Sequence, residues 1–153
     1  MTHEDHMREA LQEAEIAVRE GNAPFGVTVV DNQTNKIIWK DHDRVQEYCD
    51  PTAHGEMNAI RYLCKTLQTL SLNHTTFYTT SEPCPTCLTS MIKAKVRAVY
   101  YGAETETTAS LPLKAKELAR LSKKHPIEVT SGILAEECLA QRKDSEIDPV
   151  ALI

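Results

Sequence analysis

Two short segments place the strongest constraint on the fold, because metal-binding side chains must converge from both of them. The first is His54-Gly55-Glu56 and the second is Pro83-Cys84-Pro85-Thr86-Cys87. One imidazole and two thiols make three zinc ligands, one fewer than a structural zinc site uses, so one coordination position stays open for water. The carboxylate of Glu56 lies two residues from His54 and can reach that water without binding the metal.

Neither segment is specific when it is taken alone. A Cys-x-x-Cys pair also occurs in thioredoxin-like redox sites, which do not need a His-x-Glu segment. A structural zinc site would require a fourth ligand, and the residues of suitable type have no telling spacing: His42, His74, His125, Cys49 and Cys138. The pair of segments together favours a catalytic metal site, with a structural zinc site and a redox pair as the alternatives.

Periodicity along the chain predicts an α/β fold in a single domain, 1–153. Residues 4–20 have helical spacing, and the β-rich runs 26–30 and 36–39 predict a hairpin, followed by a loop over 40–51. The later elements are predicted as helix 52–67, strand 75–80, a helix from Pro85, strand 96–101, loop 102–111, helix 114–124, strand 127–130, helix 132–142 and a loose tail 143–153. This order gives a mixed sheet of about five strands covered by helices.

The two segments also lie where ligands bind in such sheets. Both are at predicted helix N-termini, and the second directly follows a predicted strand end. Cys84 and Cys87 are three residues apart at the start of a helix, so they share a face and can bind one ion. The helix N-terminus favours their thiolate forms.

Composition limits the partners and the compartment. No run of about 18 apolar residues is present, so we expect no membrane span. The N-terminus has no apolar signal region, and the five cysteines follow no disulfide framework, so we expect a cytoplasmic protein. The net charge of -5 weighs against general nucleic-acid binding, which relies on Lys and Arg, without excluding a local basic patch.

The two-part motif resembles the zinc-dependent cytidine deaminase-like superfamily. The resemblance covers about residues 10–141. Further segments resemble guanine deaminases, tRNA adenosine deaminases and other base deaminases: 23–26, 50–54, 81–84 and 127–138. His54-Gly55-Glu56, with Gly in the middle, is similar to fungal cytosine deaminase. The resemblance implies a three-layer αβα fold, with helices on both faces of the sheet.

The same resemblance implies hydrolytic deamination, in which zinc hydroxide attacks an amino-bearing ring carbon and ammonia leaves. One zinc ion per chain would be held by His54, Cys84 and Cys87, and Glu56 would carry the proton.

Substrate-binding roles are implied for three further positions. Phe25 would form a wall for the ring, and backbone groups near Ala53 and Glu82 would meet the polar edge of the substrate. The alternative for Phe25 is an ordinary core residue.

The chain departs from the family pattern at Asp43. Relatives usually place an Asn eleven residues before the zinc-binding His, where this chain has an Asp. An ionised carboxylate only accepts hydrogen bonds, whereas an amide also donates them. We therefore predict that the substrate presents N–H donors at this edge. The alternative is that Asp43 faces solvent and that His42 or Arg44 fills the space.

A second departure lies in the C-terminal third. No Phe, Tyr or Trp follows Tyr101, although relatives often close the pocket with aromatic residues from this part of the chain.

We predict a zinc-dependent aminohydrolase that acts on a free nucleobase or a similar small amino-heterocycle, with guanine as the leading candidate in purine metabolism. The family resemblance also predicts a homodimer. The first alternative is tRNA adenosine-to-inosine editing, which the acidic charge and a tail without a basic cluster disfavour. The second is a catalytically silent zinc-binding subunit, which has no chemical need for Glu56.

Overall fold

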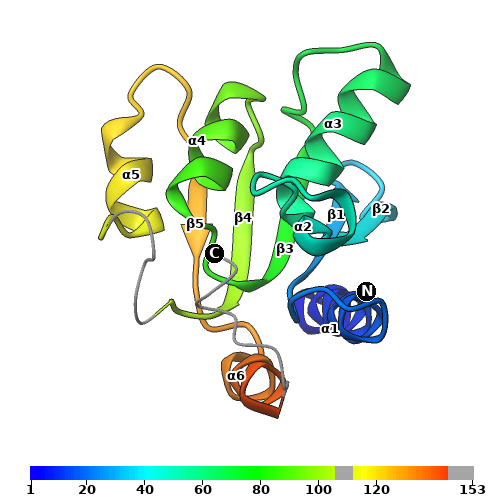
Figure 1. The fold of residues 1–153 in the computed structure, drawn as a ribbon. Coiled ribbons are helices and arrows are strands. Elements are labelled where there is room, and N and C mark those ends of the chain that lie inside the picture. Colours follow the sequence, from blue (N-terminus) through cyan, green and yellow to red (C-terminus); the bar gives the residue numbers. More distant parts are fainter. Residues whose placement is uncertain (106–111, 145–153) are drawn as a thin grey trace.

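The computed structural model describes residues 1–105 and 112–144, and the strands in this part of the chain form one mixed sheet (Figure 1). The strands are β1 (Gly26–Asp31), β2 (Ile37–His42), β3 (Thr75–Ser81), β4 (Ala98–Ala103) and β5 (Glu128–Thr130). Their order in the sheet is β2-β1-β3-β4-β5. β1 is antiparallel to β2 and β3, whereas β4 is parallel to β3 and β5. The predicted mixed sheet of five strands is confirmed.

Helices cover both faces of the sheet (Figure 1). The helices are α1 (His3–Arg19), the short α2 (Val45–Tyr48), α3 (Gly55–Leu67), α4 (Pro85–Lys93), α5 (Ala115–Leu121) and α6 (Ala135–Asp144). Side chains alternate between two apolar clusters because successive strand residues face opposite ways. Phe77 packs with residues of α3, α4 and α5, whereas Tyr78 packs with residues of α1 and α6. The three-layer arrangement is therefore also confirmed.

The long α1 is stabilised by a capping box at its N-terminus and by packing of one face against the sheet. Thr2 and Asp5 form a reciprocal capping box, in which each side chain accepts a hydrogen bond from the other's backbone N–H, at 3.1 and 2.8 Å. The helix presents fully buried alanines to the sheet: Ala10, Ala14 and Ala17. Such small side chains let the helix axis lie close to the strands.

The predicted loop over residues 40–51 is wrong at its start and in its middle. β2 continues to His42, and the residues 40–42 pair with residues 26–28 of β1. This extension carries the polar sequence Lys40-Asp41-His42, so it has no apolar alternation that could have indicated a strand. α2 follows after two residues, and its four residues are too few for helical periodicity to show.

Several predicted boundaries shift by a few residues, and the predicted helix 114–124 ends at Leu121. α3 begins at Gly55 rather than 52, because His54 is the extended N-cap residue with ψ of 156°. β4 spans 98–103 rather than 96–101. α6 begins at Ala135 rather than 132, since Gly132 has a left-handed φ of +88°. Part of the predicted loop 102–111 and most of the predicted tail lie outside the described residues. No described helix has the length and apolar character needed to cross a membrane.

Candidate active site

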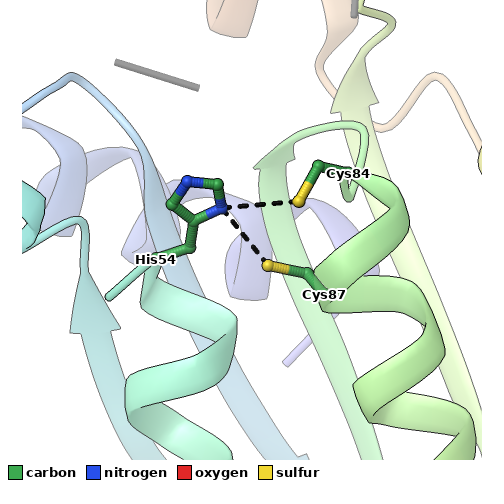
Figure 2. Close-up of side chains that lie close together, drawn as sticks. All are labelled: His54, Cys84 and Cys87. Carbon is green, nitrogen blue, oxygen red and sulfur yellow. Dashed lines mark hydrogen bonds between the residues drawn. The ribbon is translucent and has the colours of Figure 1, made fainter. Parts of the chain in front are cut away.

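The N-termini of two helices bring the three predicted metal ligands together (Figure 2). His54 is the N-cap residue of α3 and Cys84 is the N-cap residue of α4, and neither side chain caps its own helix. Cys87 lies in the first turn of α4 and is fully buried. The Nδ1 atom of His54 is 3.5 Å from Cys84 Sγ and 3.3 Å from Cys87 Sγ.

These distances fit a zinc ion between the three atoms. Two ligand atoms placed about 2.0–2.3 Å from a tetrahedral zinc lie about 3.5 Å from each other. The nitrogen and the two sulfurs lie within 4.8 Å of one another, and no fourth His, Cys, Asp or Glu of the described residues joins this group. The donor set therefore suits one zinc ion with an open coordination position, and the fourth protein ligand of a structural site is missing from the described residues.

The pKa values of the three ligand side chains depart from their ordinary values in different directions. The hydrogen bond from Cys87 and the nearby His54 lower the pKa of Cys84 to about 4. Burial lowers the pKa of His54, but the hydrogen bond to Cys84 and the charges of Glu56 and Cys84 outweigh it and raise the pKa to about 9. Cys87 donates to Cys84 and is buried, so its pKa is raised well above the usual value. A zinc ion would therefore replace protons on His54 and Cys87.

Glu56 lies beside the three ligands without being one of them. It is in the first turn of α3, only 7% exposed, and it contributes to the wall of the adjacent cavity. Burial raises its pKa, although the charge on His54 acts in the opposite direction. A carboxyl group in this position can accept a proton as the carboxylate and donate it again as the acid.

A cavity of about 570 Å³, including open solvent at its mouth, lies over the ligands. The cavity is lined by Phe25, Gly26, His54, Glu56, Ser81, Glu82, Pro83, Cys84, Thr105 and Leu113. The predicted Phe25 is thus at the cavity, together with Ser81, Thr105 and Leu113, which sequence patterns did not indicate.

Glu82 is buried in the cavity wall, but its carboxylate points toward α5 and the preceding loop. It accepts hydrogen bonds from the backbone N–H of Ala115 at 2.9 Å and of Thr105 at 3.1 Å. Lys114 Nζ lies 3.5 Å from the same carboxylate. The side chain therefore fixes the cavity wall, and a contact between substrate and the Glu82 backbone stays a prediction.

Ala53 is buried and precedes the metal ligand His54, but it does not line the cavity. Its N–H donates to Asp50 O at 3.1 Å, and its carbonyl accepts from Arg44 N and Asn58 Nδ2. Its predicted substrate contact remains untested by this geometry.

Asp43 is 1% exposed, so the alternative in which it faces solvent is wrong. Its Oδ2 accepts long hydrogen bonds from Ala23 N at 3.4 Å and Val45 N at 3.3 Å. Burial raises the pKa of Asp43, whereas the charge of His54 lowers it. Asp43 does not line the cavity, and its role toward substrate stays a prediction.

Arg142 of α6 is a neighbour of the cavity that the sequence did not reveal. Its guanidinium carbon is 5.8 Å from the centroid of the Phe25 ring. Its nitrogens donate to Ser81 Oγ at 2.9 Å and to the carbonyl of Glu104 at 3.1 Å. The last helix therefore reaches the cavity wall with a cation rather than an aromatic ring, and one Arg in a polar helix carries no sequence signal for this.

Comparisons with known proteins agree with this site. Residues 1–103 match the family described as the cytidine and deoxycytidylate deaminase zinc-binding region. The chain is 35% identical over 135 residues to a tRNA-specific adenosine deaminase of Haemophilus influenzae, covering 88% of this chain and 78% of that protein. It is 39% identical over 105 residues to a guanine deaminase of Bacillus subtilis, covering 68% and 66%. A solved structure from a study of tRNA:A34 deaminases superposes with a TM-score of 0.80 at 28% identity, covering 90% of this chain and 98% of that one.

We predict that Cys87→Ala reduces bound zinc from about one ion per chain to a small fraction, because two ligands hold the metal far less tightly than three. Cys49→Ser is the matched control, since Cys49 is exposed and outside the ligand group. Elemental analysis of the dialysed proteins measures the difference. Full zinc occupancy in Cys87→Ala would assign the metal to other ligands.

Proposed function

Because the chain belongs to the cytidine and deoxycytidylate deaminase zinc-binding family, we propose that it hydrolytically deaminates a purine base and that this base is an adenine carried by a tRNA. The extent of the similarity supports this substrate. Relatives named tRNA-specific adenosine deaminase match over 85–90% of this chain in three examples, at 34%, 35% and 28% identity, whereas the guanine deaminase matches over 68%. This support favours tRNA editing over the free base that the sequence first suggested.

Hydrolytic deamination requires two proton transfers around one ring carbon. Water loses a proton when it adds to the amino-bearing carbon, and the amine must gain a proton before it leaves as ammonia. Zinc held by His54, Cys84 and Cys87 would lower the pKa of its water to about 7 and so supply the nucleophile near neutral pH.

Glu56 is the group placed for both proton transfers. It is buried at the cavity wall next to the ligands, and burial raises the pKa of its carboxyl group. A carboxylate there would accept one proton from water and deliver it to a ring nitrogen. It would then take the second proton from the added hydroxyl group and deliver it to the amine, which leaves as ammonia while the carbonyl forms. A catalytically silent zinc-binding subunit would have no chemical need for a buried acid at this position.

Phe25 orients the base in this proposal. Its ring lies at the cavity, and the guanidinium of Arg142 packs over it from α6. The backbone carbonyl of Phe25 also accepts a hydrogen bond from Asp43 N at 3.0 Å, which fixes the residue from the other side. A flat base gains stacking energy against such a held ring.

Guanine deamination is the second candidate, and Asp43 is the observation that favours it. A buried acceptor-only carboxylate suits a base edge with N–H donors, which guanine offers and adenine lacks apart from its reacting amine. The net charge of -5 also suits a small substrate better than a polyanion.

We predict that Glu56→Gln keeps its zinc and loses activity by about a hundredfold to ten-thousandfold, because the amide cannot carry a proton. Glu136→Gln, which changes an exposed glutamate of α6, should leave activity unchanged. Ammonia release beside elemental analysis makes the comparison. Substantial residual turnover in Glu56→Gln would mean that another group carries the proton.

Substrate choice is tested by incubating the protein with unmodified tRNA and, separately, with guanine. We expect inosine to form in the tRNA, detected by reverse transcription and sequencing, and guanine to react more slowly. A gel shift at stated salt concentration measures tRNA binding in parallel. Rapid conversion of guanine to xanthine without any inosine would replace the first candidate with the second.

We further predict that Asp43→Asn changes the order of preference within a panel of aminopurines, pyrimidines and pterins. The amide adds a donor at the base edge, so substrates with acceptors there should gain about tenfold or more relative to those with N–H donors. The ratio of kcat/KM values reports the change. An unchanged order of preference removes Asp43 from substrate recognition.

A further inference from the structure

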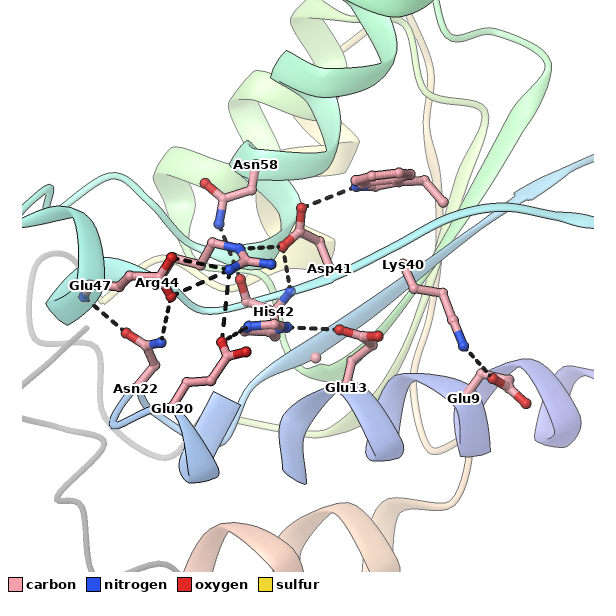
Figure 3. A network of polar contacts seen from close by, with 12 residues as sticks. Glu9, Glu13, Glu20, Asn22, Lys40, Asp41, His42, Arg44, Glu47 and Asn58 are labelled. Atoms are coloured by element: carbon pink, nitrogen blue, oxygen red, sulfur yellow. Dashed lines mark hydrogen bonds and ion pairs between the residues drawn. The ribbon is translucent and has the colours of Figure 1, made fainter. Parts of the chain in front are cut away.

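A buried imidazole is held between two carboxylates at the end of β2 (Figure 3). His42 is 2% exposed, and its Nδ1 lies 2.7 Å from Glu13 Oε2 while its Nε2 lies 2.8 Å from Glu20 Oε2. Ionised carboxylates only accept hydrogen bonds, so this geometry fits a ring in which both nitrogens donate, an imidazolium. We call Glu13, His42 and Glu20 the His42 clamp; it joins α1 and its C-cap to the last residue of β2.

The backbone of His42 lies directly against the turn that carries the proposed catalytic acid. A Cβ on Gly55 would lie 3.2 Å from His42 Cα and 3.3 Å from its carbonyl carbon. Such a contact is tighter than side chains normally make, so the absence of a side chain at residue 55 lets the two backbones meet. Gly55 separates the ligand His54 from Glu56, and any shift of His42 would therefore move both.

Asn58 adds a second link between the same two segments. Its Nδ2 donates to the carbonyl of His42 at 3.1 Å and to the carbonyl of Ala53 at 3.1 Å. Ala53 directly precedes the metal ligand His54. One buried amide thus ties the end of β2 to the residue before the ligand.

Other charged groups surround the clamp without replacing it. Asp41 accepts from the His42 backbone N–H at 2.9 Å and pairs with Arg44 at 2.9 Å. Arg44 also lies 3.8 Å from Glu20 and 3.2 Å from Glu47 of α2. Asp43 turns its carboxylate toward backbone N–H groups, and the uncharged Gly55 and Asn58 of α3 contact the His42 backbone.

We infer that His42 is a positioning residue for the deamination: the clamp presses its backbone against Gly55 and so fixes Glu56 relative to the metal ligands. The inference rests on the proposed role of Glu56 as the proton carrier. It assigns to α1, on the opposite face of the sheet from α3, a direct effect on the geometry of the active site.

The protonation of His42 gives the clamp a pH dependence. Burial lowers the pKa of His42, but the hydrogen bonds to Glu13 and Glu20 outweigh this effect and raise the pKa above its ordinary value of 6.5. A raised pKa means that the clamp contributes fully to stability below pH 6.5 and that this contribution is lost as the pH rises through the folded-state value.

The variant that tests the clamp is Glu20→Gln, which removes one charge and keeps the shape of a side chain that is 43% exposed. We expect amide hydrogen exchange at residues 54–58 of the zinc-loaded protein to accelerate about tenfold, because one charged hydrogen bond that holds the turn is weakened. On the substrate that releases ammonia in the assays above, kcat should fall while KM and zinc content stay unchanged. Glu9→Gln is the matched control, since Glu9 pairs with Lys40 at 2.9 Å between the same helix and strand, on the exposed side.

A second measurement uses the unmodified chain and so does not depend on a variant folding. Nuclear magnetic resonance of protein with nitrogen-15-labelled histidines should show both ring nitrogens of His42 protonated at pH 7. A neutral ring at pH 7, or equal exchange in Glu20→Gln and Glu9→Gln, would overturn the inference. If Glu56→Gln kept its turnover, the proposed role of Glu56 as the proton carrier would fail, and the exchange and resonance data would still decide whether the clamp holds the turn.

Discussion

The active site depends on one arrangement, the meeting of two helix N-termini at the same edge of the sheet. His54 begins α3 and Cys84 begins α4, and the side chains of both N-cap residues point toward each other instead of toward their own helices. The N-terminal ends of the helix dipoles favour negative charge, which suits a thiolate at Cys84 and a carboxylate at Glu56. Because the ligands sit on rigid elements packed against the sheet, their separation is set by the fold rather than by flexible loops.

The cavity above this site is assembled from segments that are far apart in the chain. Phe25 precedes β1, Ser81 ends β3, and Leu113 precedes α5. Buried polar side chains hold these pieces in place, since a carboxylate such as that of Glu82 can accept several directional hydrogen bonds from neighbouring backbones. Both candidate substrates present one base, so the proposed discrimination between them rests on the predicted role of Asp43 and on charge outside the cavity.

Patterns in the sequence indicated the parts of the molecule that obey local rules. Apolar periodicity located the sheet strands and most helices, and the spacing of His54, Cys84 and Cys87 indicated the metal site. The sequence pattern did not predict the end of β2, because Asp41 and His42 are polar and buried. Only tertiary partners make that combination stable. The position of Arg142 over Phe25 was not predicted for a related reason. It depends on how α6 crosses the sheet, and no local sequence pattern indicates that crossing.

At the polar end of β2, charged hydrogen bonds rather than apolar packing join the strand to α1. A buried ion pair or triad costs desolvation energy, so a well-packed apolar contact between α1 and β2 would hold the fold together at least as well. An apolar contact would, however, permit small sliding and rotation, whereas two hydrogen bonds of 2.7 and 2.8 Å to a planar ring fix both distance and orientation. The backbone that the ring orients is the one packed on Gly55. Accurate placement of Glu56, the proposed proton carrier, is the need that best accounts for charged groups at this position.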